Sequence, residues 1–423
     1  MEKFVVTGRH KLSGRIHIQG SKNSALPILS ACVLTGKPTV IHNCPELSDV
    51  DAAIKILKEL GCAVKREGDS VFVDARAANV YSIPDDLMRE MRSSIIFFGA
   101  LIGRFGKAEF SAPGGCEIGL RPIDLHIKAM ESLGVVVEND SGRVKCHCPN
   151  GLHADTIVFP FPSVGATENA ILAASLAEGT TTLVNCAREP EISDLADFLN
   201  ACGAKIRGAG EGTVVIEGVK ALGGAEYSVI PDRIVAATYM AAAAVTGGQI
   251  VLESVIPAHL RPVVPVFLES GCNINVKGHE LEITAPPELS RIHGVITMPY
   301  PGFPTDAQAP IMAMTTVARG TSVFTENIFE SRFKHVSELT RFGAKIKVEG
   351  RMAVVEGVPG LYAASVTAGD LRGGAALLVA ALAAKGTSEI TGIHHIDRGY
   401  ERAEDALSLL GADIMRLTDD RIE

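Results

Sequence analysis

Hydrophobic and polar residues alternate along this chain in a unit that recurs six times. One stretch of each unit is apolar nearly all round a helix, as in ILAASLAEG at 171–179 and ALLVAALAAKG at 376–386. A second stretch carries only an apolar stripe, as in DVDAAIKILKELG at 49–61. The first pattern predicts a buried helix, and the second predicts an amphipathic helix that covers the outside. A short β-branched strand follows each helix.

Two series of glycines mark the ends of these helices, at spacings of 66 to 73 residues. The amphipathic helices end at Gly61, Gly134, Gly203, Gly271, Gly343 and Gly411. The apolar helices end at Gly36, Gly106, Gly179, Gly248, Gly320 and Gly386. Glycine suits a helix end where the chain turns through a left-handed residue into a strand. The pattern predicts an α/β protein built by duplication, and it leaves open whether the repeats form two triplets or three pairs.

Composition and charge narrow the class of protein. A chain of 423 residues predicts two or three domains, and 40 basic against 49 acidic residues give a net charge of −9. With no basic block and no Trp, we expect no nucleic-acid partner. Nine scattered cysteines favour a reducing, cytoplasmic location. The apolar stretches 234–245 and 373–384 are too short to span a bilayer, and the first residues lack the apolar core of a signal peptide, so no membrane association is expected.

The repeat also predicts where functional side chains lie. Fourteen residues before each glycine of the second series stand Lys22, Arg92, Gly165, Ile234, Asp306 and Arg372, each at the predicted start of a buried helix. Free N–H groups and the helix dipole favour anions there. Three cations at these positions therefore indicate an anionic ligand such as a phosphate or a carboxylate. For Lys22 we expect a role in binding rather than in stability. Plain solvated charges at exposed helix starts are the alternative.

The segment SAPGGCEIGLRPIDLH, residues 111–126, carries the strongest candidate for chemistry. Cys116 lies among glycines, which indicates a loop, and nearby Arg121 favours the thiolate. Cys116 is therefore a candidate nucleophile or acid. The alternative, a free cysteine that serves as a small hydrophobe, fits better at Cys32, Cys62 and Cys202.

Asp306 is a second candidate, because PGFPTDAQ at 301–308 places it at the start of a buried helix. The sequence leaves open whether it is a general base or an ordinary helix-start residue. Cys146, His147 and Cys148 do not predict a metal site, because strand alternation turns the imidazole away from the sulfurs and no second ligand pair follows. No P-loop or dinucleotide fingerprint is present, so we expect no metal and no cofactor.

Ten segments together resemble one family from end to end. They are GSKNSALPIL (20–29), DLMREMRSSI (86–95), PGGCEIGLRPIDLH (113–126), FPSVGATENA (161–170), AREPEISDL (187–195), PDRI (231–234), PGFPTDAQA (301–309), ENIFESRFKHV (326–336), DLRGGAALL (370–378) and HHIDRGYER (394–402). The chain resembles the UDP-N-acetylglucosamine 1-carboxyvinyltransferases of the enolpyruvyl transferase family.

The resemblance implies a two-domain inside-out α/β barrel with three repeats per domain, in which sheets and outer helices surround buried helices. It implies one domain at 22–229 that carries the Cys116 loop, a second at 1–21 plus 230–423, and an active site in the cleft between them.

The resemblance also implies the activity. The family transfers the enolpyruvyl group of phosphoenolpyruvate to the 3-hydroxyl of UDP-N-acetylglucosamine by addition and elimination, releasing phosphate. This is the first committed step of peptidoglycan precursor synthesis, which serves the cell wall, cell shape and cell division. By the same resemblance, Cys116 is the acid that protonates the enol carbon, forms a covalent adduct and is alkylated by fosfomycin. Asp306 is the base for the sugar hydroxyl.

Further site residues come from the resemblance alone. For phosphoenolpyruvate they are Lys22, Asn23, Arg121, Arg332 and Arg398. For UDP-N-acetylglucosamine they are Arg92, Arg121, Pro122, Ile123, Asp124, Leu125, Ser163, Val164, Gly165, Asp306 and Ile328.

The chain departs from the family pattern at Ser48, at Phe161-Pro162 and at Val235, which puts nucleotide affinity and inhibitor response in doubt rather than the reaction. Two alternatives remain. The sister family that uses shikimate 3-phosphate carries an arginine shortly after its lysine and lacks the loop cysteine, whereas residues 24–31 here read SALPILSA. A non-catalytic paralogue that binds sugar nucleotides is the other.

Overall fold

The computed structural model describes residues 2–90, 93–111, 123–140 and 142–418. These residues divide into two units. Unit 1 comprises residues 2–19 and 231–418, and unit 2 comprises the described residues between 20 and 230. Each unit has its own hydrophobic core, and neither core shares a residue with the other.

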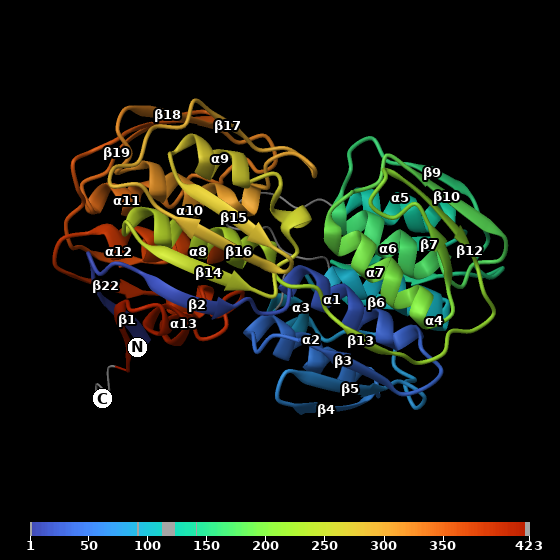
Figure 1. The fold of residues 1–423 in the computed structure, drawn as a ribbon. Coiled ribbons are helices and arrows are strands. Elements are labelled where there is room, and N and C mark those ends of the chain that lie inside the picture. The colour runs from blue at the N-terminus through green and yellow to red at the C-terminus, as the bar shows by residue number, and fades with distance from the viewer. Residues whose placement is uncertain (1, 91–92, 112–122, 141, 419–423) are drawn as a thin grey trace. The chain divides into compact units, whose positions relative to one another are not determined.

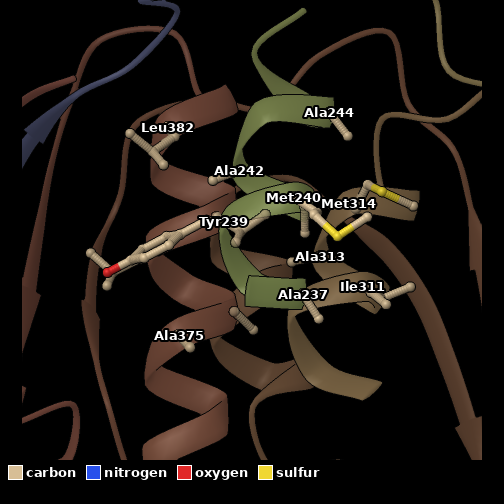
Figure 2. Close-up of a cluster of buried hydrophobic side chains, with 14 of the residues drawn as sticks. Ala237, Tyr239, Met240, Ala242, Ala244, Ile311, Ala313, Met314, Ala375 and Leu382 are labelled. Atoms are coloured by element: carbon tan, nitrogen blue, oxygen red, sulfur yellow. The ribbon is translucent and has the colours of Figure 1, made fainter. Parts of the chain in front are cut away.

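Three apolar helices form the centre of unit 1, and all three contact one another. They are α8 (Arg233–Val245), α10 (Thr305–Thr315) and α12 (Leu371–Ala383). Figure 2 shows their contact, where small residues such as Ala237 and Ala242 alternate with Met240 and Met314. Alanine lets the helix backbones approach closely, while the flexible methionines fill the remaining gaps.

Unit 2 repeats this arrangement with α1 (Lys22–Ala31), α4 (Phe97–Phe105) and α6 (Val164–Ala174). Here α4 contacts both α1 and α6. A Cβ atom at Gly99 of α4 would lie 2.2 Å from the carbonyl oxygen of Asn169 on α6. Only glycine therefore allows the approach of these two helices.

Sheets surround the buried helices of each unit (Figure 1). In unit 1 the strand orders are β15 (Asn273–Lys277)-β16 (Glu280–Thr284)-β14 (Gln249–Glu253)-β2 (Ser13–His17), β17 (Val295–Ile296)-β18 (Thr321–Thr325)-β20 (Met352–Glu356)-β19 (Lys345–Glu349) and β21 (Ser365–Thr367)-β22 (Thr387–Thr391)-β1 (Glu2–Thr7)-β23 (Asp413–Thr418). In unit 2 they are β13 (Glu226–Ser228)-β3 (Thr39–His42)-β5 (Ser70–Asp74)-β4 (Ala63–Glu67), β11 (Lys205–Arg207)-β12 (Thr213–Glu217)-β10 (Thr180–Val184)-β9 (Thr156–Val158) and β6 (Lys107–Ser111)-β8 (Arg143–His147)-β7 (Val136–Asp140).

Five of these sheets share one pairing pattern, in which a single parallel pair is followed by two antiparallel pairs. In the sixth, an isolated parallel bridge from Ser82 to Glu109 stands where the others have a parallel strand. The repeated α/β architecture expected from the sequence is thus confirmed. The described strands form six separate sheets, none of which closes on itself as a barrel.

Shorter helices complete the repeats. The outer helices are α2 (Ser48–Glu59), α5 (Asp124–Ser132), α7 (Pro190–Ala201), α9 (Val264–Glu269), α11 (Val336–Arg341) and α13 (Ala403–Leu409), with α3 (Asp85–Glu90) beside α2. Short 3₁₀ segments are η1 (Cys32–Leu34), η2 (Ser94–Ile96), η3 (Pro257–Leu260) and η4 (Ile393–His395). All six glycines predicted to end the outer helices have positive φ, between 90° and 100°. Across the described residues, no helix has the length and apolar character required to cross a bilayer.

The first strand of the chain completes the last repeat. β1 lies between β22 and β23 and pairs antiparallel with both. In the sheet of unit 1 that contains β19 and β20, the equivalent central position is taken by β20, the second strand of the β19–β20 hairpin. Phe4 and Val6 of β1 are fully buried, and the guanidinium of Arg416 on β23 lies 4.9 Å from the centre of the Phe4 ring. The two ends of the chain are therefore held in one sheet.

We expect Phe4→Ala to lower the free energy of unfolding by about 3–5 kcal/mol, because it leaves a cavity under a strand that joins the two chain ends. Denaturant unfolding of the whole protein and of the variant measures this loss of stability. Val5→Ala, on the partly exposed face of the same strand, is the control and should change stability little. An equal loss in both variants would show that β1 contributes through strand pairing rather than through its buried face.

Candidate active site

Five of the six positions predicted at helix starts lie there. Lys22 is the first residue of α1, and the second residues of their helices are Gly165 in α6, Ile234 in α8, Asp306 in α10 and Arg372 in α12. The sixth, Arg92, lies outside the described residues. The repeat therefore brings chemistry-bearing side chains to one end of the buried helices.

Asp306 lies between two guanidinium groups in unit 1. Its Oδ1 accepts a hydrogen bond of 2.7 Å from Nη2 of Arg332, and its Oδ2 accepts one of 2.9 Å from Nη2 of Arg372. Both arginine side chains are 4% exposed, whereas the Asp306 side chain is 29% exposed. Two buried cations thus share one accessible carboxylate.

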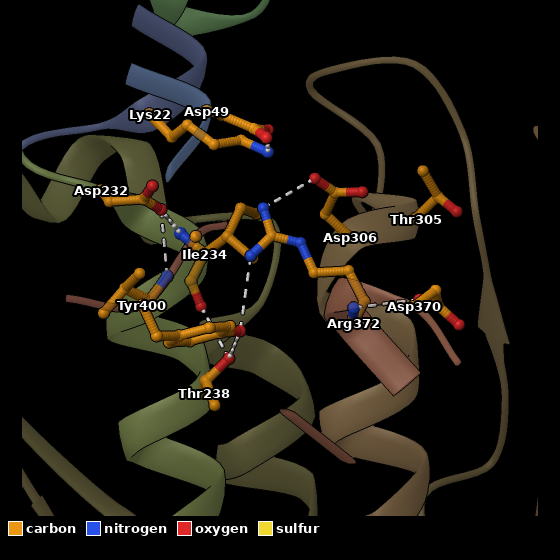
Figure 3. A network of polar contacts seen from close by, with 12 residues as sticks. Lys22, Asp49, Asp232, Ile234, Thr238, Thr305, Asp306, Asp370, Arg372 and Tyr400 are labelled. Atoms are coloured by element: carbon orange, nitrogen blue, oxygen red, sulfur yellow. Dashed lines mark hydrogen bonds and ion pairs between the residues drawn. The ribbon is translucent and has the colours of Figure 1, made fainter. Parts of the chain in front are cut away.

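Arg372 has further partners inside the core (Figure 3). Its Nη1 donates to the hydroxyl of Tyr400 at 3.4 Å, and its backbone N–H donates to Oδ1 of Asp370, the N-cap of α12. Burial, the largest single effect, lowers the pKa of Arg372, but Asp306, Tyr400 and Asp232 together outweigh it and raise the pKa above its ordinary value. Arg372 therefore stays a cation although it is buried.

Arg332, the second guanidinium group on Asp306, has contacts of its own. Its Nη2 also donates to the carbonyl oxygen of Thr305, and its own carbonyl oxygen faces Nδ1 of His335 at 3.1 Å. Burial lowers the pKa of His335 to about 4, so this imidazole is neutral at pH 7. Among the described atoms, Nε of Arg332 is buried without a hydrogen-bond partner. Arg332 thus keeps an unused N–H donor beside Asp306.

Ile328 lies in the loop that precedes Arg332. Its N–H and that of Phe329 donate to Oε1 of Glu326, whose Oε2 accepts from the hydroxyl of Thr305. Glu326 is 1% exposed, so one buried carboxylate ties this loop to the first residue of α10. The structure thus brings Ile328 and Arg332 to the same helix end as Asp306.

In unit 2, Lys22 forms an ion pair with Asp49, the second residue of α2, at 3.1 Å between Nζ and Oδ2. The two side chains are 11% and 3% exposed. This pair corrects the argument that the cations at helix starts need a ligand as their anionic partner, because Asp49 and Asp306 already provide carboxylates. Asn23 follows Lys22 and is half-buried.

The start of α6 packs against α5, which brings two predicted nucleotide-binding segments together. Ser163 caps α6 by accepting a hydrogen bond from the N–H of Ala166, and a Cβ at Gly165 would lie 3.0 Å from Cε1 of His126 on α5. Ile123, Asp124 and Leu125 directly precede this histidine. Val164 is the first residue of α6.

The His126 ring is fixed by Asn169 of α6. Since the N–H of Gly99 can only donate, it identifies Oδ1 of Asn169 as the acceptor at 2.5 Å. Nδ2 of Asn169 therefore donates to Nδ1 of His126 at 2.8 Å. Burial lowers the pKa of His126 to about 4, so the ring is neutral with its proton on Nε2.

Arg398 lies in the turn after η4, and two contacts hold that turn. The Gln19 side chain donates to the carbonyl of Gly399 and accepts from the N–H of Glu401. Arg416 donates to both carboxylate oxygens of Asp397 at 2.6 and 3.1 Å. Arg398 itself is half-buried.

Four predicted site residues lie outside the described residues: Arg92, Cys116, Arg121 and Pro122. Sequence reasoning missed the roles of Asp49, His126, Asn169 and Tyr400 around the predicted site residues. A signal existed in part, because His126, Asn169 and Tyr400 belong to segments that carried the family resemblance, whereas Asp49 does not.

The comparisons with known proteins cover nearly the whole chain. Residues 6–407 match the family model described as EPSP synthase (3-phosphoshikimate 1-carboxyvinyltransferase). The chain is 50% identical over 417 residues to UDP-N-acetylglucosamine 1-carboxyvinyltransferase 2 of Caldanaerobacter subterraneus, which spans 99% of this chain and 100% of that protein. The chain belongs to the enolpyruvyl transferase family, on its UDP-N-acetylglucosamine 1-carboxyvinyltransferase branch. The enzyme numbered 1 from Symbiobacterium thermophilum is 48% identical, over 98% of this chain and 95% of that protein.

Solved enolpyruvyl transferases share the fold. The crystal structure of the enolpyruvyl transferase NikO from Streptomyces tendae matches with a TM-score of 0.89 and 26% identity over 99% of both chains. EPSP synthase from Acinetobacter baumannii matches with a TM-score of 0.77 over 99% of this chain and 100% of that chain, at 18% identity, which shows the fold alone. The enolpyruvyl transferase fold expected from the sequence is confirmed.

We expect Lys22→Met to lower the free energy of unfolding in the absence of substrates by about 3 kcal/mol, because it leaves the Asp49 carboxylate without the lysine charge. Denaturant unfolding of Lys22→Met, Asp49→Asn and the double variant measures the coupling between the two side chains. Lys55→Met, which removes an exposed pair with Glu90, is the matched control and should cost less than about 1 kcal/mol. A Lys22→Met protein as stable as the parent would restore the expectation from the sequence that this lysine serves binding alone.

We expect His126 to make stability fall as the pH drops from about 6.5 to 4. The pKa of His126 is about 4 in the folded protein, whereas an unfolded histidine titrates near 6.5, so only the unfolded state binds the proton in this window. His126→Gln keeps an oxygen that can accept from Asn169. Between about pH 6.5 and pH 5 the variant should lose about 1.5 kcal/mol less stability than the parent. Urea unfolding at both pH values measures the difference, and equal losses would contradict a neutral, buried His126.

Proposed function

We propose that this protein transfers the enolpyruvyl group of phosphoenolpyruvate to the 3-hydroxyl of UDP-N-acetylglucosamine and releases phosphate. Relatives at 45–50% identity over nearly the full chain carry the name UDP-N-acetylglucosamine 1-carboxyvinyltransferase. The single observation that carries the proposal in the structure is the accessible Asp306 carboxylate between two buried guanidinium groups. It places an acceptor for a hydroxyl proton next to donors for an anionic substrate.

The reaction balances as an addition followed by an elimination. In the addition, the sugar hydroxyl oxygen bonds to C2 of phosphoenolpyruvate, a proton joins C3, and the hydroxyl proton leaves to a base. In the elimination, a base takes a proton from C3, the C2–C3 double bond re-forms, and the C2–O bond to phosphate breaks. In this proposal Cys116 supplies the proton to C3 and Asp306 accepts the hydroxyl proton.

The charges of phosphoenolpyruvate account for the cations. It carries a phosphate and a carboxylate, and charge-assisted hydrogen bonds from fixed guanidinium and ammonium groups are the strong way to bind them. We assign Lys22, Asn23, Arg121, Arg332 and Arg398 to this substrate. The free Nε of Arg332 supports the assignment, because a buried donor without a partner gains most from a bound anion.

The sugar nucleotide is assigned to two groups of residues. The first comprises Ile123, Asp124, Leu125, Ser163, Val164 and Gly165 at the starts of α5 and α6, together with Arg92, Arg121 and Pro122, which lie outside the described residues. The second comprises Asp306 and Ile328. The N-terminus of α6, an eleven-residue helix, supports a diphosphate there, because its free N–H groups favour anions. The rigid packing of Gly165 on His126 would keep these donors in place.

Transfer to shikimate 3-phosphate is the second candidate, because the matching family model carries that enzyme's name. Sequence identity to known proteins favours the first candidate function over the second. The relatives named for UDP-N-acetylglucosamine are 45–50% identical, whereas the EPSP synthase structure is 18% identical. We also infer a cytoplasmic enzyme of cell-wall synthesis that fosfomycin inhibits, as the branch implies. We assign no cofactor or metal to the reaction.

Phosphate release tests the function. The purified protein should release phosphate when phosphoenolpyruvate and UDP-N-acetylglucosamine are both present, and mass spectrometry should find the sugar nucleotide heavier by one enolpyruvyl group. Shikimate 3-phosphate in place of the sugar nucleotide is the control acceptor and should give no phosphate release. Release with shikimate 3-phosphate alone would select the second candidate, and release with neither would favour a binding protein without catalysis.

Cys116 variants test the assigned acid in the same assay. Cys116→Ala should abolish release, whereas Cys116→Asp should keep it and resist fosfomycin, because a carboxyl group donates a proton but is a poor nucleophile toward an epoxide. Intact-mass analysis after fosfomycin treatment reports how many drug molecules are attached, and peptide mapping identifies the cysteine that carries them. A label on another cysteine, such as the half-buried Cys148, would contradict the assignment.

A further inference from the structure

Tyr400 is a buried phenol at the centre of the polar network in Figure 3. It is 1% exposed and follows the turn that carries Arg398. Its hydroxyl lies 2.8 Å from Oγ1 of Thr238 on α8 and 3.4 Å from Nη1 of Arg372 on α12. The guanidinium of Arg372 also lies 5.8 Å from the centre of the Tyr400 ring. Tyr400 thus links two of the three buried helices at the end where Asp306 stands.

The hydrogen bonds of this network run in one direction. The Thr238 hydroxyl has a single proton, which it donates to the carbonyl oxygen of Ile234 at 3.0 Å. Thr238 must therefore accept from Tyr400, whose hydroxyl also has one proton. The Tyr400 oxygen is then left to accept from Arg372, which can only donate. The order is Arg372 to Tyr400, Tyr400 to Thr238, and Thr238 to the backbone of α8.

We propose that Tyr400 and Thr238 are positioning residues that hold the Arg372 guanidinium against Asp306. This inference rests on the proposed function, in which Asp306 accepts the hydroxyl proton. The backbone of α8 orients the Thr238 hydroxyl, Thr238 orients the Tyr400 hydroxyl, and Tyr400 presents only a lone pair to Arg372. The guanidinium keeps its other nitrogen, Nη2, on Oδ2 of Asp306 at 2.9 Å.

Packing alone does not account for the Tyr400 hydroxyl. A phenylalanine would fill the same space in this core, and a buried hydroxyl costs free energy unless it is paired. The nearby Tyr239 on α8 is 4% exposed and packs in the same core. The two tyrosines therefore form a matched pair, one bonded to Arg372 and one that the network does not use.

Other charged and titratable groups also face this arginine and aspartate. Those on the elements packed around them are Arg332, Asp232 at the start of α8, Asp370 at the start of α12, Glu326 beside Thr305, and His335 below Arg332. None of them contacts the Tyr400 hydroxyl in a hydrogen bond among the described residues. Replacing the hydroxyl therefore changes the support of Arg372 without removing a charge.

Tyr400→Phe tests the proposal in the phosphate-release assay, with Tyr239→Phe as the matched control. We expect Tyr400→Phe to lower kcat at least about 10-fold, because a misplaced guanidinium weakens its hold on Asp306. The acid limb of the kcat profile should move to higher pH, because the carboxylate loses part of its cationic support. Tyr239→Phe should leave kcat and the pH profile unchanged.

Thr238 variants test the direction of the hydrogen bonds. Thr238→Val removes the acceptor of the Tyr400 proton, so it should lower kcat and shift the acid limb in the same sense as Tyr400→Phe. Thr238→Ser keeps the hydroxyl and should restore kcat relative to Thr238→Val. A Tyr400→Phe protein with a lower melting temperature but unchanged kcat and pH profile would overturn the proposal and leave Tyr400 a structural residue.

A measurement without substrate keeps this test separate from the proposed function. Nuclear magnetic resonance of ¹⁵N-labelled arginine reports the rotation of each guanidinium group, which hydrogen bonds at both Nη atoms slow. We expect the Arg372 rotation to quicken in Tyr400→Phe and to stay as in the parent in Tyr239→Phe. Unchanged rotation overturns the positioning role. If the parent protein shows no transfer with either acceptor, the function fails, and the rotation alone decides the inference.

Discussion

A helix that is apolar on every side must be buried on every side, and this constraint decides where the protein can place polar chemistry. Each unit buries three such helices, and sheets and outer helices cover them. Their flanks disfavour charge, and burial raises the pKa of Glu168, which lies on the flank of α6, well above its ordinary value. The ends of the helices are the places where charged groups can be partly exposed. Lys22, Gly165, Asp306 and Arg372 all stand at the first or second residue of a buried helix. The site is therefore a consequence of the packing rather than an addition to it.

Charges at these ends are stable only with partners, and the protein provides them from neighbouring helix starts. Asp49 begins α2 and faces Lys22, while Asp306 begins α10 and faces Arg372 of α12. A buried pair contributes little net stability, but the loss of one partner is costly, so each pair constrains its members to act together. This explains why cations can occupy helix starts that the dipole disfavours. In the proposed function, a substrate anion would therefore bind beside an existing carboxylate.

The sequence predicted the parts of this arrangement that depend on local structure. Helix-ending glycines, apolar helices and helix-start positions all follow from one stretch of chain at a time. Where the structure describes these features, it confirms them, except that Gly36 and Gly248 lack the expected positive φ. It did not predict which side chains would pair, because Tyr400 and Thr238, or Lys22 and Asp49, meet only through tertiary packing. The family resemblance grouped residues 1–21 with residues 230–423. The pairing itself was not predictable, since residues 2–7 give no local sign that they pair with strands near residue 390 and residue 415.

The two guanidinium groups that bind Asp306 limit when this carboxylate can accept a proton in the proposed reaction. A carboxylate that accepts two charge-assisted hydrogen bonds holds its negative charge firmly and is a weak base. A sugar hydroxyl is a far weaker acid, so the proton cannot transfer before the new C–O bond begins to form. As that bond forms, the hydroxyl oxygen gains positive charge and its proton becomes acidic enough for a weak base. In the proposed reaction, proton transfer must therefore accompany or follow bond formation, and the placement of Asp306 by Arg332 and Arg372 matters more than its basicity.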